Sequence, residues 1–289
     1  MSDSDFVYYL SRSEDVRSHA EHNLEGSSGR QRVPKEAFEN LVLKLPPLDE
    51  QKRIAGVLSS LDDKIDLLNR ENETLEALAE TLFRHYFIET PNPEWKEGKL
   101  GDVVDVKSGF AFKGSSFVEG GKYKLVTIKA VQDGFLSLEN SDCITEVPSN
   151  VKDYCYLKKG DILLSLTGNV GRCCLVDSDG LLLNQRVALL VAKDKRNWPF
   201  VYTFFRLQST KSLLEEMAKG TAQPNLSPVE LAKMSFFIPP QNILEQFGRE
   251  ASPIIEKVLS NRQQIQILST LRDTLLPRLM SGVVKVVGQ

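Results

Sequence analysis

The sequence predicts an α+β fold: one domain with a curved, mostly antiparallel sheet and flanking helices, plus a long antiparallel two-helix coiled coil. Two observations carry this prediction. Two stretches of the chain repeat each other at a distance of about 190 residues, and each repeat ends in a sustained heptad pattern. The segment between the heptads alternates short apolar runs with glycine-containing turns, which is typical of a β-rich domain.

The repeat rests on five landmarks that occur in the same order, with an offset that stays between 193 and 195 residues. One shared tripeptide would be chance, whereas five ordered landmarks indicate a duplicated module. The first copy lacks most of its front, because its first landmark, Phe6-Val7-Tyr8, corresponds to a segment late in the second copy. The landmark pairs are Phe6-Val7-Tyr8 with Phe200-Val201-Tyr202, Gly26-Ser27-Ser28 with Gly220-Thr221-Ala222, Val33-Pro34-Lys35-Glu36 with Ser227-Pro228-Val229-Glu230, Leu45-Pro46-Pro47 with Ile238-Pro239-Pro240, and Glu50-Gln51 with Glu245-Gln246.

Each heptad pattern follows a Pro-Pro pair, which marks a helix start because proline is not tolerated inside a helix. In each pattern the apolar positions are spaced alternately four and three residues apart, so they form one continuous seam along the helix. At the rise of a helix, each seam is on the order of 50 Å long. The first seam comprises Ile54, Leu58, Leu61, Ile65, Leu68, Asn72, Leu75, Ala79, Leu82 and Tyr86. The second comprises Phe247, Ala251, Ile254, Val258, Asn261, Ile265, Leu268, Arg272, Leu275 and Leu279.

Each seam contains one asparagine, Asn72 in the first and Asn261 in the second. If the helices pair antiparallel, the two amides face each other, and a hydrogen-bonded pair fixes the register of the seam. The alternative is that each helix packs separately on a globular domain and that both asparagines face water.

The segment from residue 95 to 240 contains apolar runs that predict strands at 125–128, 161–166 and 187–191. Residues 200–205 and 213–217 are predicted as helices. Four polar loops between these elements carry donors and acceptors suited to bases and phosphates, since Asn and Gln can pair with adenine and Arg or Lys with guanine. Ordinary turn chemistry is the alternative explanation. The candidate DNA contacts are Lys107, Ser108, Lys113, Ser115, Thr167, Asn169, Arg172, Asn184, Gln185, Arg186, Gln223 and Asn225.

Charge is distributed unevenly along the 289 residues, whose net charge is −3. Residues 95–235 hold 19 Lys and Arg against 16 Asp and Glu, so the acidic excess lies in the helical parts. This balance permits an anionic partner on the middle segment. Dinucleotide, phosphate-loop, esterase and zinc-protease motifs are absent, and the four cysteines show no ligand spacing. We therefore expect a reader or adaptor without catalytic residues or a metal site.

No apolar run approaches the roughly 18 residues of a membrane span, and the acidic N-terminus lacks the order of a signal peptide. With cysteines in no disulfide-like pattern, a cytoplasmic protein is expected.

The chain resembles the specificity subunit of type I restriction-modification systems. The resemblance covers almost the whole sequence and rests on motifs that are specific only together and in order. These are Leu45-Pro46-Pro47-Leu48-Asp49-Glu50-Gln51 before a helix with Asn69-Arg70-Glu71, Trp95 with Lys99-Leu100-Gly101-Asp102-Val103, Ser108-Gly109-Phe110-Ala111-Phe112-Lys113, Gly160-Asp161-Ile162-Leu163 with Thr167-Gly168-Asn169-Val170-Gly171, Asn184-Gln185-Arg186, and Gly220 with Gln223-Pro224-Asn225-Leu226-Ser227.

This resemblance implies a non-catalytic DNA-recognition subunit. Such subunits carry two target-recognition domains, which read the two halves of a split double-stranded DNA sequence, and two spacer helices that set the gap. They bind methyltransferase subunits and, through these, restriction subunits. S-adenosylmethionine, ATP and Mg belong to those partners, and no cofactor is expected in this chain.

The chain departs from the family's usual order and looks like a truncated or half-length form. The implied organisation is a remnant of a first recognition domain (1–47), a spacer helix (48–89), a complete recognition domain (90–240), a second spacer helix (241–282) and a tail (283–289). Such a chain would read one half-site, and two copies could pair. The alternatives are an inactive cassette or recombination donor, and a coiled-coil interaction protein that never binds DNA.

Overall fold

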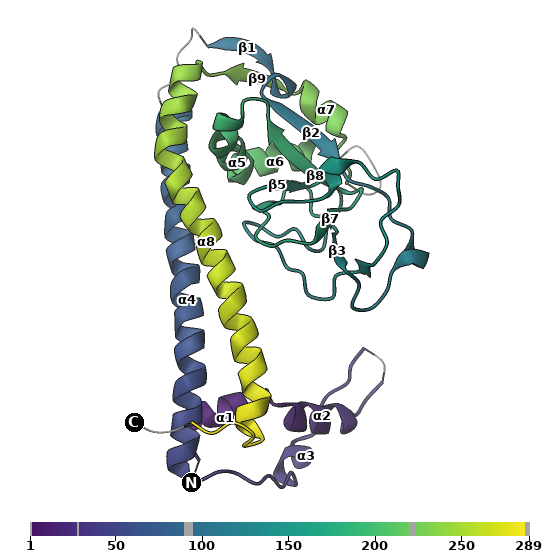
Figure 1. Ribbon diagram of the computed structural model, residues 1–289, viewed down its shortest axis with the longest axis vertical. Helices are drawn as coiled ribbons and strands as arrows, with labels where there is room; N and C mark the ends of the chain where they lie inside the picture. The colour runs from purple at the N-terminus through teal and green to yellow at the C-terminus, as the bar shows by residue number, and fades with distance from the viewer. Residues whose placement is uncertain (1, 28, 90–94, 220–223, 287–289) are drawn as a thin grey trace. The chain divides into compact units, whose positions relative to one another are not determined.

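The computed structural model describes residues 2–27, 29–89, 95–219 and 224–286. Its contacts divide the chain into two compact units, residues 1–70 with 264–289 and residues 71–263. Two long helices pass through both units, α4 (Leu48–Arg84) and α8 (Gln241–Met280) (Figure 1). Each begins directly after a Pro-Pro pair, and every predicted seam position is buried or half-buried. No described helix combines the length and the apolar character that crossing a membrane requires.

The first unit contains three short helices, of which the first packs against parts of the two long ones. They are α1 (Ser4–Ser11), α2 (Glu14–His22) and α3 (Lys35–Glu39). Asp3 caps α1 by accepting a hydrogen bond from the Phe6 amide at 3.0 Å. Phe6 is buried against Ile54 and Leu58 of α4, and Leu279 of α8 belongs to the same core. These apolar contacts hold α1 on the long helices.

Polar contacts in the first unit confirm that α4 and α8 run antiparallel there. Asp62 of α4 accepts a hydrogen bond from Arg272 of α8 at 2.7 Å and another from the Tyr9 hydroxyl at 2.8 Å. Residue numbers rise along α4 as they fall along the facing stretch of α8, with Leu58 and Leu279 in one cluster. The same direction holds in the second unit, where Asn72 contacts Asn261 and Phe83 contacts Phe247.

The second unit contains the sheets, whose strands run from blue through teal to green in Figure 1. After α4 comes one π-helical segment, and short 3₁₀ segments connect several strands. The strands are β1 (Lys96–Lys99), β2 (Val104–Ser108), β3 (Tyr123–Val126), β4 (Cys143–Ile144), β5 (Ile162–Ser165), β6 (Cys173–Leu175), β7 (Leu181–Leu183), β8 (Val187–Ala192) and β9 (Ser235–Ile238). The helical elements are η1 (His85–Glu89), η2 (Leu100–Asp102), η3 (Gly114–Ser116), η4 (Asp153–Cys155), η5 (Lys195–Asn197), α5 (Trp198–Arg206), α6 (Gln208–Met217) and α7 (Pro228–Lys233).

The described strands form three sheets, and the predicted α+β class is confirmed. The largest is antiparallel with the order β2-β8-β5-β6, the second has the order β4-β3-β7, and β1 pairs with β9. The pairing of β3 with β7 is parallel and all others are antiparallel. The strand predicted at 125–128 lies instead at Tyr123–Val126, and the predicted helices are longer than their apolar cores.

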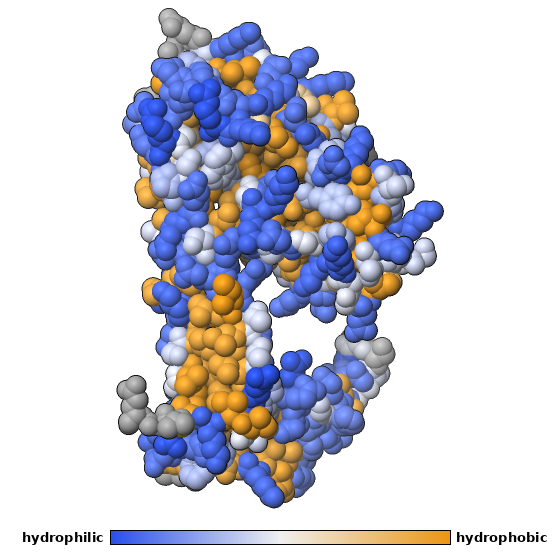
Figure 2. Space-filling view, in the orientation of Figure 1, coloured by the Kyte–Doolittle hydropathy of each residue, from blue (hydrophilic) through white to orange (hydrophobic). Residues whose placement is uncertain are grey.

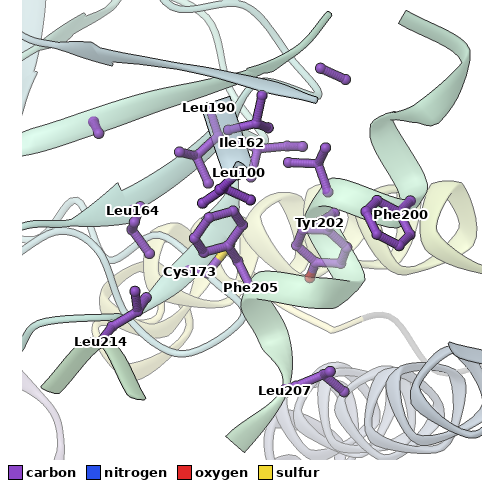
Figure 3. Packing of buried hydrophobic residues seen from close by; sticks show 14 of the residues in the cluster. Leu100, Ile162, Leu164, Cys173, Leu190, Phe200, Tyr202, Phe205, Leu207 and Leu214 are labelled. Atoms are coloured by element: carbon purple, nitrogen blue, oxygen red, sulfur yellow. The ribbon is translucent and has the colours of Figure 1, made fainter. Parts of the chain in front are cut away.

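Strand β5 is buried throughout, and three of its four residues are apolar, because both faces of its sheet are covered. Ile162 and Leu164 point into the core that contains α5, whereas Leu163 belongs to a second core on the other face. Successive side chains of a strand alternate between faces, so a strand buried on both sides lacks the polar alternation of a half-exposed one. Figure 3 shows Ile162 and Leu164 near Phe205 of α5.

Candidate functional site

Five of the predicted contact residues line one surface depression in the second unit, with a volume of about 410 Å³. They come from four segments that are distant in sequence. The lining consists of Ser108, Leu166, Thr167, Gln185, Arg186, Asn225, Leu226 and Pro228. The polar residues Ser108, Thr167, Gln185, Arg186 and Asn225 were predicted, and the apolar floor of Leu166, Leu226 and Pro228 was not. An apolar residue beside a polar one carries no recognition signal in sequence, so only packing reveals this floor.

Backbone hydrogen bonds join the segments that surround the depression. The Leu166 amide donates to the Arg186 carbonyl at 3.0 Å, and the Leu226 amide donates to the Leu166 carbonyl at 2.8 Å. These bonds place the end of β5 between the segment before β8 and the segment before α7. The side chains of three separate loops are therefore held by sheet-like pairing rather than by loop conformation alone.

Gly109 allows the end of β2 to approach the loop before β8. A Cβ atom at this position would lie 2.3 Å from the Asn184 carbonyl oxygen, which is closer than atoms can pack. The Phe110 amide then donates to Leu183, and the Gln185 amide donates to the Phe110 carbonyl at 3.0 Å. Ser108 and Gln185 consequently line the same depression.

The Asn225 side chain is oriented by a neighbouring hydroxyl. Thr167 donates a hydrogen bond from Oγ1 to Asn225 Oδ1 at 2.7 Å, and Thr167 is buried while Asn225 is exposed. With its oxygen occupied, Asn225 presents its Nδ2 group as a donor. Within the described ranges, no carboxylate forms an ion pair with the exposed Arg186, and no side-chain hydrogen bond engages the exposed Gln185. These three residues can therefore offer hydrogen bonds to a ligand.

Lys107 borders an adjoining depression of about 530 Å³, which shares Pro228 with the first. The Lys107 ammonium lies 5.5 Å from the ring centroid of Tyr154, within cation–π range. The Tyr154 hydroxyl donates to the Ser108 carbonyl at 3.0 Å, and burial raises the pKa of Tyr154. The phenol thus stays protonated and keeps the end of β2 in place.

The other predicted residues do not line this depression. Arg172 donates a hydrogen bond to Gln132 Oε1 at 2.6 Å, and the Asn169 carbonyl accepts one from the Ser165 hydroxyl. Lys113 and Ser115 are exposed in and beside η3, and Asn184 forms an isolated bridge with Phe110. Gln223 lies outside the described residues. The structure thus divides the predicted set into one cluster and several separate positions.

The depression has the chemistry of a binding surface. Its lining contains no carboxylate, histidine or cysteine, the side chains that serve as acid, base or metal ligand. In the part of the chain that the structure describes, no three such residues are grouped to hold a metal ion. Hydroxyl, amide and guanidinium groups above an apolar floor suit the recognition of polar ligands with flat apolar edges, such as nucleic-acid bases.

Comparisons with known proteins show the family to which the chain is similar. The chain matches the family described as type I restriction modification DNA specificity domain over residues 2–77 and 92–275. It is 28% identical to the type I restriction enzyme MjaIX specificity subunit of Methanocaldococcus jannaschii, covering 98% of this chain and 69% of that protein. It is 21% identical to the HindI specificity subunit of Haemophilus influenzae, covering 96% and 77%.

Among solved structures, the fold resembles the type I restriction-modification S subunit from M. genitalium. The TM-score is 0.60 at 19% sequence identity, and the match covers 96% of this chain and 72% of the other. A second specificity subunit of M. jannaschii, MjaVIII, is 27% identical, and the chain spans 66% of its length. The chain thus corresponds to about two thirds to three quarters of each relative.

Proposed function

Because the chain belongs to the type I restriction-modification DNA specificity domain family, we propose that its second unit reads one half-site of a split DNA target. The depression formed by Ser108, Thr167, Gln185, Arg186 and Asn225 is the base-reading surface in this proposal. Its convergence from four chain segments is the observation that carries the proposal. Lys107, Lys113, Ser115, Asn169, Arg172, Asn184 and Gln223 are proposed as additional DNA contacts.

The roles of the central residues follow from their chemistry. An arginine can donate two hydrogen bonds to a guanine edge, and a glutamine amide can pair with an adenine edge. Arg186 and Gln185 are adjacent and exposed, so they can reach neighbouring bases. Asn225, held by Thr167, supplies a donor whose direction is set before binding. The ammonium groups of Lys107 and Lys113 suit phosphate oxygens, which position the protein without specifying sequence.

We also propose that the long helices act as a spacer and bind methyltransferase subunits, through which restriction subunits are recruited. The exposed apolar residues Leu67, Ile267 and Leu271, on the parts of α4 and α8 that belong to the first unit, support a protein partner there, since exposed apolar surface marks interaction sites. In Figure 2, orange apolar surface covers part of these helices within the first unit. In this proposal the chain is cytoplasmic and non-catalytic, and S-adenosylmethionine, ATP and Mg are bound by the partners.

The oligomeric state is part of the same proposal. A chain with one reading surface recognises one half-site, so a homodimer would recognise a palindromic split site. Light scattering of the full chain, alone and with a methyltransferase subunit, distinguishes a complex that contains one copy of the chain from a complex that contains two. One copy per pair of methyltransferase subunits would contradict the homodimer while leaving the reading surface in place.

The first test is DNA binding by the full chain, measured by fluorescence anisotropy with random-sequence duplexes. A reader of this kind retains weak, salt-sensitive non-specific binding with a Kd of about 10⁻⁴–10⁻⁶ M. The target itself is found by sequencing methylated sites in cells with and without the chain. Absence of binding at low salt, with and without a methyltransferase subunit, would overturn the proposal and favour a coiled-coil interaction protein or an inactive cassette.

The second test uses the depression directly. Arg186→Ala and Gln185→Ala should each cost about 1–3 kcal/mol against the cognate half-site and little against random DNA. Arg249→Ala is the matched control, because Arg249 is an exposed arginine on α8 that lines a different surface depression. Equal losses on both DNAs would assign Arg186 to a phosphate instead of a base.

A further inference from the structure

A cavity of about 280 Å³ lies within the second unit, between α5 and the parts of α4 and α8 that belong to this unit. Its walls come from α4 between residues 73 and 80, from residues 202–207 at the end of α5, and from residues 255 and 258 of α8. None of its lining residues lines the depression around Arg186. The cavity is therefore a second and separate concave site.

Two hydroxyl groups in the wall of this cavity are buried without a hydrogen-bond partner. Tyr202 and Thr203 are each 2% exposed, and neither Tyr202 Oη nor Thr203 Oγ1 bonds to any described residue. Figure 3 shows Tyr202 and Leu207 within the surrounding core. Burial raises the pKa of Tyr202 well above its usual value, so its hydroxyl stays protonated and can donate. Buried polar groups nearly always have partners, so both hydroxyls call for an occupant of the cavity.

The ion pair in the same wall also has hydrogen-bonding capacity left. Glu76 Oε2 accepts a hydrogen bond from Arg206 at 2.5 Å, while Glu76 Oε1 and Arg206 Nε are buried and form no hydrogen bond with the described residues. The Arg262 guanidinium lies 3.9 Å from Glu76 Oε1, beyond the range of a hydrogen bond. The wall thus offers one carboxylate acceptor, one guanidinium donor and two hydroxyls.

The size and the apolar walls of the cavity favour an organic ligand over water. Several water molecules would be needed to fill this volume, and each of them needs about three hydrogen bonds. Besides the four polar atoms without partners, the wall includes the buried side chains of Leu207, Ile255 and Val258. A molecule with apolar faces and one polar edge matches this surface better. Since a cavity of roughly 150 Å³ admits benzene, a cavity of about 280 Å³ admits a somewhat larger ring system.

We propose that this cavity binds an uncharged planar heterocycle of nucleobase size, which carries a hydrogen-bond acceptor next to a donor on one edge. The acceptor receives hydrogen bonds from the Tyr202 hydroxyl and from Arg206 Nε, and the donor binds Glu76 Oε1. The faces of the ring pack against Ile255 and Val258 of α8. A ligand in this position contacts α4, α5 and α8 at once, so it stabilises the folded second unit.

The charge of the lining disfavours an anionic ligand. Glu73, Glu76 and Glu80 place three carboxylates in the wall, against the single guanidinium of Arg206. A negative potential repels phosphate groups, so a free base fits this site better than a nucleotide or a DNA strand. The proposal is therefore independent of DNA reading by the second unit.

Adenine is the probe, because its N7 acceptor and its N6 amino donor lie on one edge. Calorimetric titration of the full chain should show saturable binding of one adenine per chain. Tyr202→Phe removes only the hydroxyl and should weaken this binding about three- to tenfold. Tyr123→Phe is the matched control, because Tyr123 is a half-buried tyrosine of β3 in the same unit and does not line the cavity. Adenosine 5′-monophosphate should bind at least about tenfold more weakly than adenine.

Thermal unfolding gives an independent measurement. Adenine should raise the unfolding temperature of the unmodified chain by more than that of Tyr202→Phe, since a ligand of the folded state shifts the transition in proportion to its affinity. Thr203→Val carries the same expectation and serves if Tyr202→Phe does not fold. Gln185→Ala, which changes the other depression, should leave the affinity for adenine unaltered.

Absence of saturable adenine binding would overturn the proposal, because the cavity would then hold water only. Equal affinities of the unmodified chain, Tyr202→Phe and Thr203→Val would also overturn it, as would tighter binding of adenosine 5′-monophosphate than of adenine. Loss of adenine binding in Gln185→Ala would place the base in the other depression and contradict the assignment. None of these outcomes bears on DNA binding, which is measured separately.

Discussion

Asn261 donates a hydrogen bond from its Nδ2 group to Oδ1 of Asn72 at 2.9 Å, and neither residue is exposed to solvent. The same Nδ2 group also donates to Glu71 Oε2 at 3.0 Å. Among the described residues, Asn72 Nδ2 and Asn261 Oδ1 have no hydrogen-bond partner. A buried asparagine pair that leaves some of its hydrogen-bonding groups without a partner lowers the stability of the fold. We therefore propose that the pair fixes the register of the two helices.

Replacing both asparagines by leucine should therefore raise thermal stability, because two unpartnered buried polar atoms, at about 1–3 kcal/mol each, are removed. Asn72→Leu alone should destabilise, since Asn261 then loses the acceptor. Thermal unfolding of the single and double variants measures the coupling. Register is checked by engineered cysteine pairs across the seam: a double variant that crosslinks only in the native register would contradict the register role.

Thr167→Val should weaken binding to the cognate half-site by about three- to tenfold, the effect of one lost neutral hydrogen bond. Valine keeps the shape of threonine but cannot hold Asn225 Oδ1. Anisotropy titrations measure the change, and Thr81→Val on the exposed side of α4 is the control. If Asn225→Ala has no effect on cognate affinity, Thr167 has no positioning role.

Glu76→Gln should destabilise the second unit by about 1–3 kcal/mol. Glu76 accepts a hydrogen bond from Arg206 at 2.5 Å, and both side chains are only 21% exposed, so the arginine would lose its main partner in a site with little water. Glu80→Gln is the control, because its pair with Arg84 is about half exposed and 4.0 Å long. Exposed pairs of this kind contribute about 0–1 kcal/mol. Urea unfolding followed by circular dichroism should separate the two variants.

Asp62 should make the first unit sensitive to acid. Burial alone would raise the pKa of Asp62, but hydrogen bonds from Arg272 and Tyr9 and the nearby arginine charges lower it below its usual value. A lowered folded-state pKa gives stability that is complete above the unfolded value of about 3.9 and is lost as pH falls through the folded value. Asp62→Asn should lower stability at pH 7 by about 1–3 kcal/mol and flatten its dependence below about pH 4.

Urea titrations between about pH 3 and pH 7 measure this effect. The control is Asp66→Asn, because the Asp66–Arg70 pair is 68% and 66% exposed. An acid-sensitivity that is the same in Asp62→Asn as in the unmodified chain would assign the effect to other carboxylates.

Cys143 should be the cysteine that reacts fast in the native protein. It is half-buried, whereas Cys155, Cys173 and Cys174 are buried, and burial raises the pKa of Cys173 to about 12. The thiolate is the reactive form, so the buried thiols should react only after unfolding. Labelling with a thiol reagent at about pH 8 should show one fast group, which Cys143→Ser removes. Two or more fast groups in the native chain would contradict the burial.

Features that depend on short-range periodicity follow from the sequence. The Pro-Pro pairs and the heptads define where α4 and α8 begin and which side of each is buried, because a helix brings every third and fourth residue to one face. The apolar runs likewise predict β5 and β8. Strand β3 begins and ends two residues earlier than predicted, since its ends are decided by pairing with β4 and β7, which no local pattern encodes.

In the candidate site, too, the sequence predicts the chemistry of single residues but not how they are grouped in space. Residue chemistry identified Gln185, Arg186 and Asn225, but not that they would share a depression while Arg172 contacts Gln132, 40 residues away. Likewise, the sequence alone determines that Val7-Tyr8 and Val201-Tyr202 occupy equivalent places on a helix. Only the tertiary structure decides that one pair is exposed and the other buried, because burial depends on which sheet covers the helix, and that sheet is formed by residues far along the chain.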